Sequence, residues 1–473
     1  HNLVMVLVQM IIRLQYFWHH THLKLLQCII NKFTTMKKIS YILFALLLCQ
    51  ITFAQAPEWT KDKTIYEVNI RQYTQEGTFG AFATHLPRLE KMGVGILWLM
   101  PVQPIGELNR KGSLGSYYSI ADYTATNPEF GSMKDFKKLV DEAHKRDMTI
   151  ILDWVANHTS FDHVWMKSHP EFYTTDKSGN VIPPVADWSD VADLNYDNKA
   201  MRAAMIADMK FWVTEADIDG FRCDVAGMVP DDFWIEALAE LKKIKPDIFL
   251  LAEAEGPQFH TDGFHMTYGW SKHHIMNEIA KGKALADRMD SIIVNHNTVY
   301  PAGSYFMNFT SNHDENSWNG TEFERMGDGA KTFGVMAATI PGMFLLYTGQ
   351  EVALDRRLKF FDKDSVVWLD NRNFTQFYTT LIQLKADNPA LWNGSYGGDY
   401  KRIDTQHEKI YAYTRTLGDN KVLVILNLSS DAHDAVLNTD SGKYKNVFTG
   451  KKQKLKAGKK ITVPAWGYVV LKQ

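Results

Sequence analysis

The sequence has few cysteines and no block of one charge, and each shortage excludes a class of protein. Only three cysteines occur in 473 residues, and two of them, Cys28 and Cys49, fall in a segment that we expect to be removed. No intrachain disulfide can then form. The formal net charge is −2, and lysine and arginine are scattered along the chain. Because a phosphate backbone requires a concentrated basic surface, we expect no nucleic-acid partner.

The chain also lacks a long apolar run of the kind that spans a membrane. The apolar segment Ile39–Phe53 follows the basic start Met36-Lys37-Lys38 and precedes the small residues of Ala54-Gln55-Ala56. This order is typical of a bacterial secretory signal, whereas a membrane span needs about 20 apolar residues. We predict a signal peptide at 36–56, export to the periplasm or the medium, and no stable membrane span. Residues 1–35 begin with His, and we interpret them as sequence upstream of a start at Met36.

Short apolar runs alternate with amphipathic stretches from Thr64 onward, a pattern typical of a parallel sheet with intervening helices. The predicted strands are Thr64–Arg71, Gly95–Pro101, Thr149–Asp153, Gly220–Asp224, Phe249–Glu253, Phe264–Tyr268, Phe306–Thr310 and Met343–Tyr347. The predicted helices are Phe82–Met92, Met133–Arg146, Lys199–Glu215, Pro230–Ile244 and Lys272–Met289. Eight strands close a barrel, so we predict an α/β fold with a (β/α)8 TIM barrel over 57–387. The long polar stretch 159–197 is predicted to be a short inserted domain after the third strand.

The sequence changes character near Asn388. Short alternating runs separated by Asp, Asn and Gly then follow, at Lys409–Arg415, Lys421–Leu428, Tyr444–Thr449 and Lys460–Val470. This pattern predicts a C-terminal antiparallel β-sandwich domain over 388–473.

Three acidic residues stand where predicted strands end. They are Asp224, Glu253 and Asp314. A single acid at such a place is often a helix cap or half of an ion pair. Because chemistry in a parallel barrel is done at the carboxyl ends of the strands, three acids on different strands indicate a catalytic site instead.

The motifs around these acids resemble those of glycoside hydrolase family 13, the α-amylase superfamily. The resemblance extends along most of the chain after residue 57. It rests on Asp153 to His158, Gly220 to Asp224, Glu253, Asn312-His313-Asp314, the loop motif Asp193-Leu194-Asn195, and Tyr118 in Tyr118 to Tyr123.

The resemblance implies a role for each of these residues. Asp224 is the expected nucleophile, Glu253 the acid/base, and Asp314 the third catalytic acid, which holds the distorted sugar. Arg222 would keep the Asp224 carboxylate ionised. Tyr118 would stack on the sugar, and His158 and His313 would hydrogen-bond to it. Those four residues are the expected substrate-binding set.

Three points stay open at this stage. Glu255 is a rival for the acid/base role, because strand alternation sends it to the same face as Glu253. Asn157 matches a frequent calcium-ligand position of the family, but its alternative role is to tie down a loop by hydrogen bonds alone. Gly227 and Met228 stand where many α-amylases carry Lys and His, which leaves substrate choice and the balance of hydrolysis and transfer open.

The expected function is hydrolysis of α-1,4-glucosidic bonds in starch-type glucans or maltooligosaccharides, with retention of configuration. The alternative within the superfamily is an α-glucosidase or a transglycosylase. The alternative from another class is a glucan-binding protein without catalytic activity on the same fold. The presence of all three acids together with Arg222 argues against that last reading.

Overall fold

The computed structural model describes residues 55–439, 441–458 and 460–473. The predicted upstream segment 1–35 and the predicted signal peptide, apart from Gln55 and Ala56, lie outside the described residues. Within the described part, no helix is long and apolar enough to cross a membrane.

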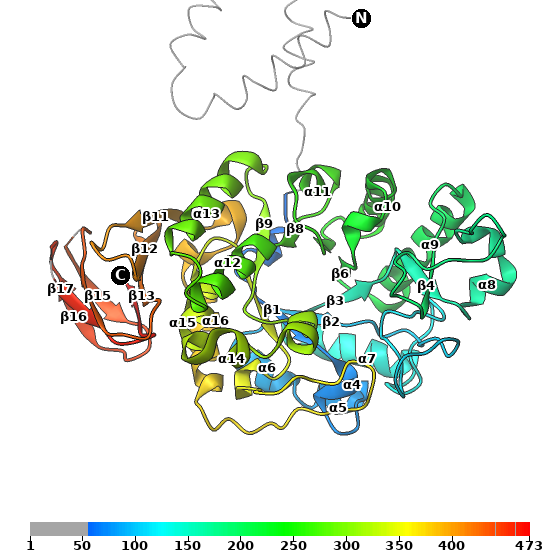
Figure 1. Cartoon of the computed structure of the whole chain (residues 1–473), viewed down its shortest axis with the longest axis horizontal. Helices are drawn as coiled ribbons and strands as arrows, with labels where there is room; N and C mark the ends of the chain where they lie inside the picture. The colour runs from blue at the N-terminus through cyan, green and yellow to red at the C-terminus, as the bar shows by residue number, and fades with distance from the viewer. Residues whose placement is uncertain (1–54, 440, 459) are drawn as a thin grey trace, which may run out of the picture. The chain divides into compact units, whose positions relative to one another are not determined.

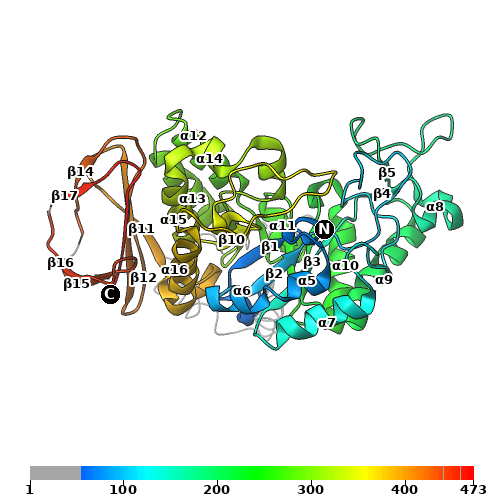
Figure 2. The same ribbon diagram turned by 90° about the horizontal axis from the view of Figure 1, so that it is seen from below.

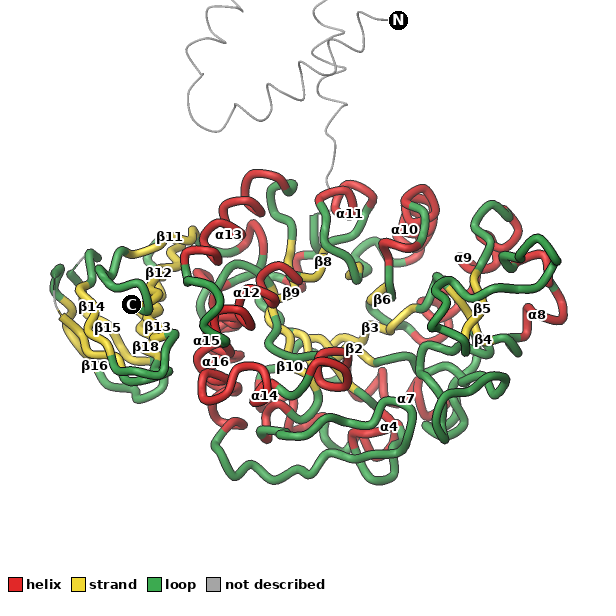
Figure 3. Tube along the Cα trace, viewed as in Figure 1, coloured by secondary structure: helices red, strands yellow, loops and turns green. Residues whose placement is uncertain are grey.

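Eight parallel strands form a closed barrel, as predicted (Figures 1 and 3). They are β1 (Ile65–Val68), β2 (Ile96–Leu99), β3 (Thr149–Trp154), β6 (Gly220–Cys223), β7 (Phe249–Ala252), β8 (Met266–Tyr268), β9 (Tyr305–Asn308) and β10 (Met343–Tyr347). Around the ring the order is β1-β10-β9-β8-β7-β6-β3-β2. Nearly every residue of these strands is buried, because helices cover the outer face and side chains fill the interior.

Helices surround the barrel. They are α4 (Ile70–Tyr73), α5 (Phe79–Ala83), α6 (Leu86–Met92), α7 (Met133–His144), α9 (Lys199–Ala216), α10 (Asp231–Ile244), α11 (Pro257–Asp262), α12 (Trp270–Ala280), α13 (Asp287–Val299), α14 (Glu322–Met326), α15 (Ala330–Thr339) and α16 (Phe374–Asp387).

Two of the predicted helices are each two helices in the structure. The stretch 272–289 is divided between α12 and α13, because Gly282 takes a positive φ of 69° just after α12 ends. The stretch 82–92 is divided between α5 and α6, and Pro87 stands in the first turn of α6, where its missing N–H costs nothing.

The insertion after β3 contains its own small sheet. It carries β4 (His158–Ser160), α8 (Val164–Ser168) and β5 (Val191–Asp193), and β4 pairs with β5 in antiparallel register, His158 opposite Asp193. This pairing returns the chain to the barrel mouth, so both ends of the insertion lie beside the strand ends.

The C-terminal part forms antiparallel sheets, also as predicted. Its strands are β11 (Asp399–Ile403), β12 (Ile410–Leu417), β13 (Asn420–Asn427), β14 (His433–Val436), β15 (Gly442–Asn446), β16 (Lys452–Leu455), β17 (Lys460–Val463) and β18 (Tyr468–Lys472). Six of them form one sheet, and β14 pairs with β17 in a separate ribbon. The single strand expected over 460–470 is therefore two strands in different sheets. The break falls at Pro464, which has no N–H to donate to a ladder.

The central strands β12 and β13 of the six-stranded sheet are buried on both faces. One face packs with the β14–β17 ribbon in a core that includes Ile425, Ala435 and Val463. The other face packs against the barrel domain, where the Tyr413 hydroxyl lies 2.5 Å from Thr339 Oγ1 at the end of α15. Figure 2 shows the sheet next to α15 and α16, on the side of the barrel away from the insertion.

Candidate active site

A cavity of about 560 Å3 at the carboxyl ends of the barrel strands contains most of the predicted site residues. The predicted residues that line it are Tyr118, His158, Asp224, Glu253, His313 and Asp314. Arg222 lies beneath them and is fully buried. Residues from β2, β3, β6, β7 and β9, or from the loops that follow these strands, thus converge on one place.

Arg222 is the centre of this cluster. In the β3–β6 register Arg222 is the partner of Asp153, and its Nη1 lies 2.8 Å from Asp153 Oδ1. The same Nη1 donates to Asp224 Oδ1 at 2.9 Å. Its Nη2 lies 2.9 Å from Glu253 Oε2, close enough for an ion pair although the angle is not that of a hydrogen bond. One guanidinium therefore fixes the two predicted catalytic carboxyl groups as close neighbours.

Arg222 supplies one positive charge to three carboxyl groups, those of Asp153, Asp224 and Glu253. This imbalance affects the pKa values of Asp224 and Glu253. Burial raises the pKa of the Asp224 carboxyl, and Arg222 opposes this shift only in part, because it also faces Asp153. Burial likewise raises the pKa of Glu253, and the nearby Asp314 carboxylate adds to the effect. Arg222 thus favours the ionised form of Asp224, as the resemblance implied, but burial and the neighbouring carboxyl groups outweigh its effect on the pKa. The pair titrates as a unit that retains one proton longer than isolated carboxyl groups would.

Val225, directly after Asp224, holds a strained backbone conformation. Its φ is 35°, in the left-handed region that a β-branched residue rarely adopts. The strain turns the Val225 N–H toward Glu253 Oε2, which accepts it at 2.7 Å. Strained backbone that persists at such a place is typical of a functional site, because the surrounding structure must pay for it.

A second chain of contacts starts at Glu67, in the middle of β1. Its Oε1 lies 2.5 Å from His313 Nδ1, and both side chains are buried. On its other side the His313 ring contacts the Tyr118 hydroxyl at 2.7 Å and Asp314 Oδ2 at 3.3 Å. Burial alone would lower the pKa of His313, but the Asp314 and Glu67 carboxylates raise it to about 9. His313 is therefore an imidazolium that fixes Tyr118 and Asp314.

His158, unlike His313, is uncharged. Burial lowers the pKa of His158 to about 3, so the ring is neutral. Its Nδ1 accepts from Asn157 Nδ2 at 3.2 Å, which leaves the ring proton on Nε2. A neutral histidine of this kind can hydrogen-bond to a sugar hydroxyl without adding charge to the cavity.

The surroundings of Asn157 give little support for a metal site. Its backbone carbonyl accepts from Leu194 N at 3.3 Å and its side chain bonds to His158. Among the described residues, no three or more His, Cys, Asp or Glu side chains converge as metal ligands. These contacts match the loop-tying role. Calcium binding at Asn157 stays a prediction.

Glu253 and Glu255 differ in their contacts, and the difference favours Glu253 for the acid/base role. β7 ends at Ala252, so strand alternation no longer governs Glu255, and its side chain turns to the start of α12. There it accepts from Ser271 N at 2.8 Å and Ser271 Oγ at 2.5 Å, and lies 3.2 Å from His296 Nε2. Although burial opposes it, these contacts lower the pKa of Glu255, whereas the pKa of Glu253 is raised. Glu255 is thus an ionised helix cap outside the cavity.

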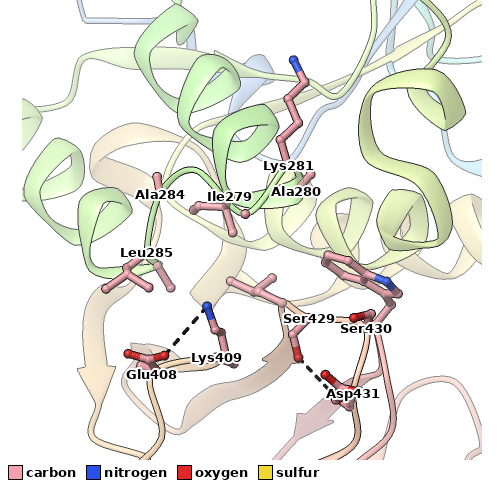
Figure 4. A pocket seen from close by; sticks show the side chains of 14 residues that line it. Ile279, Ala280, Lys281, Ala284, Leu285, Glu408, Lys409, Ser429, Ser430 and Asp431 are labelled. Carbon is pink, nitrogen blue, oxygen red and sulfur yellow. Dashed lines mark hydrogen bonds and ion pairs between the residues drawn. The ribbon is translucent and has the colours of Figure 1, made fainter.

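A second hollow of about 350 Å3 lies between the α12–α13 turn and the C-terminal domain (Figure 4). Trp466, Leu285 and Leu428 supply its apolar part. Its charged residues include Glu408 and Lys409, which pair with each other at 3.8 Å. It contains none of the predicted catalytic acids and no pair of carboxyl groups bound to one arginine, so the chemistry belongs to the barrel mouth.

Sequence reasoning missed the buried Glu67, which contacts His313, and several residues that line the catalytic cavity. Glu67 carried a signal, since a carboxylate in an otherwise apolar parallel strand needs a buried partner. The others line the cavity and had no periodicity to reveal them; they lie on loops, except for Val191 in β5 and Trp318 in a short π-helical turn (Glu315–Asn319). They are Lys111, Ser116, Trp188, Asp190, Val191, Val225, Trp318, Phe360 and Phe361.

The family model of the α-amylase catalytic domain matches residues 57–180 and 185–393. This chain belongs to glycoside hydrolase family 13, the α-amylase family. A second model, that of the α-amylase SusG C-terminal domain, matches residues 410–470. The chain is therefore a glycoside hydrolase, and the interpretation as a protein without catalytic activity is set aside.

Individual relatives agree with this membership. Alpha-amylase 3 of Dictyoglomus thermophilum is 26% identical over 469 residues, which cover 84% of this chain and 91% of the relative. Alpha-amylase MalA of Haloarcula japonica is 28% identical over 80% of this chain, which spans only 57% of MalA. The crystal structure of an α-amylase from Lactobacillus plantarum superimposes with a TM-score of 0.80 at 30% identity, over 88% of this chain and 99% of that one. Other relatives are named maltosyltransferases, so hydrolysis and transfer both occur among them.

Proposed function

We propose that this chain is an exported, retaining hydrolase of α-1,4-glucosidic bonds in starch-type glucans or maltooligosaccharides. Asp224 is the nucleophile, Glu253 is the acid/base, and Asp314 is the third acid. The observation that carries the proposal is the single guanidinium of Arg222, which contacts both Asp224 and Glu253 at 2.9 Å. Retaining enzymes need two carboxyl groups close together, because one of them attacks the anomeric carbon directly.

The geometry supports a two-step reaction. In the first step Asp224 attacks the anomeric carbon as a carboxylate while Glu253, which this assignment requires to carry the proton of the pair, protonates the departing oxygen. The bond between the sugar and the leaving chain breaks, and a covalent glycosyl–Asp224 intermediate forms. In the second step Glu253, now a carboxylate, takes a proton from water, whose oxygen displaces Asp224.

Other residues of the cavity hold the sugar. Asp314 and His158 line the cavity and offer an acceptor and a neutral donor to sugar hydroxyls. The Tyr118 ring is fixed by its hydroxyl, which donates to Asp153 Oδ2 at 3.0 Å. A fixed aromatic face gives the apolar side of a pyranose a platform at little cost in entropy.

Transglycosylation is the second candidate, and a specific observation keeps it. Gly227 and Met228 replace the Lys and His that many α-amylases place near the leaving-group sugars, and Met228 is exposed. An exposed apolar side chain there offers an acceptor sugar a surface to compete with water. Incubation with starch, pullulan and maltotriose, followed by identification of the products, separates the candidates. Products longer than the substrate would show transfer, and unchanged substrates would contradict the proposed function.

Export is part of the proposal and rests on the predicted signal peptide. Ala56 is buried in the cluster that also contains Ile65 and Phe249. Cleavage after Ala54 would keep this contact, whereas cleavage after Ala56 would remove it. A signal peptide over 36–56 would give a start at Pro57, but the buried Ala56 favours a start at Gln55 in secreted material, and N-terminal sequencing will test this. Material that keeps the first 35 residues would contradict export by this route.

A further inference from the structure

A short segment after β2 joins two other loops across the edge of the catalytic cavity. We call residues 111–114 the bridging segment. Toward the insertion, Lys111 Nζ lies 2.9 Å from Asp190 Oδ1 and donates to the Asp187 carbonyl at 2.9 Å. The Asp190 side chain is only 6% exposed, whereas the Lys111 side chain is 33% exposed, so the salt bridge is shielded on the Asp190 side. The segment is thus fixed to the insertion by a charged contact.

The same segment is joined to the loop between β10 and α16. Ser113 donates to Asp362 Oδ1 from its backbone N at 2.9 Å and from its Oγ at 2.6 Å. Leu114 N donates to the Phe361 carbonyl at 2.9 Å. Gly112 has φ 63°, and a Cβ there would lie 2.4 Å from Phe361 Cβ, so the two loops touch without a gap. Three loops therefore form one continuous wall.

The wall belongs to the cavity and is held from behind. Lys111, Asp190 and Phe361 all line the same cavity as the catalytic acids. The buried Arg71, in the short helix α4 that follows β1, donates to the carbonyls of Leu114 and Gly115 at 3.1 and 3.0 Å. A segment fixed on three sides is a permanent part of the cavity edge.

The order of strands tells which end of a bound glucan meets this wall. Two loops of the wall follow β2 and β10, the two neighbours of β1 in the ring, and the third follows β3, which lies midway between β1 and β7; β7 stands four strands from β1 in either direction. Glu253 follows β7 and protonates the leaving oxygen, so the departing part of the chain leaves on the β7 side. Tyr118, the expected platform of the attacked sugar, follows the bridging segment. The sugars on the non-reducing side of the broken bond therefore point toward the wall.

We infer that this wall closes the cavity at its non-reducing end, so that the enzyme removes short saccharides from chain ends instead of cutting within the chain. The inference rests on the proposed function and specifies its substrate class, which is the free non-reducing end of an α-1,4-glucan. A chain that continues past the first few sugars would have to pass through the Lys111–Asp190 and Ser113–Asp362 contacts. Lys111 and Asp362 are then the residues that decide specificity.

The test compares maltoheptaose with maltoheptaose whose non-reducing glucose carries a 4,6-O-ethylidene group. A closed end rejects the added group, so the wild-type enzyme should cleave the blocked sugar about a hundredfold more slowly than the free one. The double variant Lys111→Ala/Asp362→Ala removes the side-chain ties on both sides of the segment. We expect it to raise the blocked-to-free rate ratio at least about tenfold. Lys137→Ala, which breaks an exposed Lys–Glu pair away from the cavity, should leave the ratio unchanged.

Each outcome bears on a different statement. Equal rates on both sugars in the wild type would overturn the closed end and leave glucan hydrolysis standing. Cleavage of neither sugar would refute the proposed function, and the inference with it. A wild-type preference that the double variant leaves unchanged would overturn the role of the wall. Activity of the variant on the free sugar shows that it is folded, and the wild-type comparison needs no variant.

Discussion

Replacement of Glu253 by Gln tests the division of roles between the two carboxyl groups. The substitution keeps a carbonyl oxygen where Glu253 Oε2 accepts from Val225 N at 2.7 Å and lies 2.9 Å from Arg222 Nη2. The fold should therefore be preserved. The amide cannot give a proton to the glycosidic oxygen, and general acid catalysis is worth about 10²–10⁴ in rate. We expect kcat on maltooligosaccharides to fall by this factor, which is about 3–5 kcal/mol of barrier.

The choice of leaving group makes this result specific. In an α-glucosyl fluoride the leaving group is fluoride, which departs without being protonated. The first step on this substrate should therefore be slowed less than about tenfold in Glu253→Gln. The second step lacks its base, and the glycosyl–Asp224 intermediate should accumulate enough for detection by mass spectrometry. The matched control is Glu255→Gln, because Glu255 caps α12 and lies outside the cavity. The assignment would be refuted if Glu253→Gln slowed the first step equally on the fluoride and on the glucan. It would also be refuted if Glu255→Gln slowed the first step on the glucan but not on the fluoride.

Further predictions concern the nucleophile, the charged histidine and calcium. Asp224→Asn should abolish turnover on every substrate and keep glucan binding; a loss below about tenfold, or about 1.4 kcal/mol, would place the nucleophile elsewhere. Glu67→Gln removes one of the carboxylates that hold the pKa of His313 at about 9. Because the imidazolium exists below this pKa, the alkaline limb of the activity–pH profile should move to lower pH by about one unit or more, and an unchanged limb would contradict the role of Glu67. If calcium binds at Asn157, calcium at roughly 100 times its Kd should stabilise the fold by about 3 kcal/mol. Asn157→Ala should abolish this stabilisation. An unchanged unfolding temperature of the wild type in calcium would contradict the site.

The barrel could be predicted because its strands are buried on both sides. The runs 150–152 and 343–347 are apolar or aromatic throughout, and the structure places strands at Thr149–Trp154 and Met343–Tyr347. Burial on both faces is what a parallel strand in a barrel requires, so its signal in the sequence is strong. Helix ends were harder to predict, since the break near Gly282 depends on a single positive φ within an otherwise helical pattern.

The candidate acids could be predicted from their place at strand ends, but their electrostatics could not. The sequence shows that Arg222 precedes Asp224 by two residues. It does not show that Asp153, from another strand, shares the same guanidinium, which depends on the β3–β6 register. The wall across the cavity was invisible for a similar reason, because Ser113 and Asp362 are 249 residues apart and meet only through the ring order of the strands.

Burial of the charged side chains of the site destabilises the fold, so their arrangement needs an explanation other than stability. Arg222, Asp153 and Glu67 are almost completely excluded from solvent. The attraction between buried charges offsets the free energy lost on desolvation only when the geometry of the contacts is good. Replacing such a cluster with apolar side chains would often leave a fold no less stable, so packing gives no reason for it. A reaction that needs one carboxyl ionised and its neighbour protonated does give a reason. The lone guanidinium between Asp224 and Glu253 stabilises the shared negative charge without removing the proton that the leaving group requires.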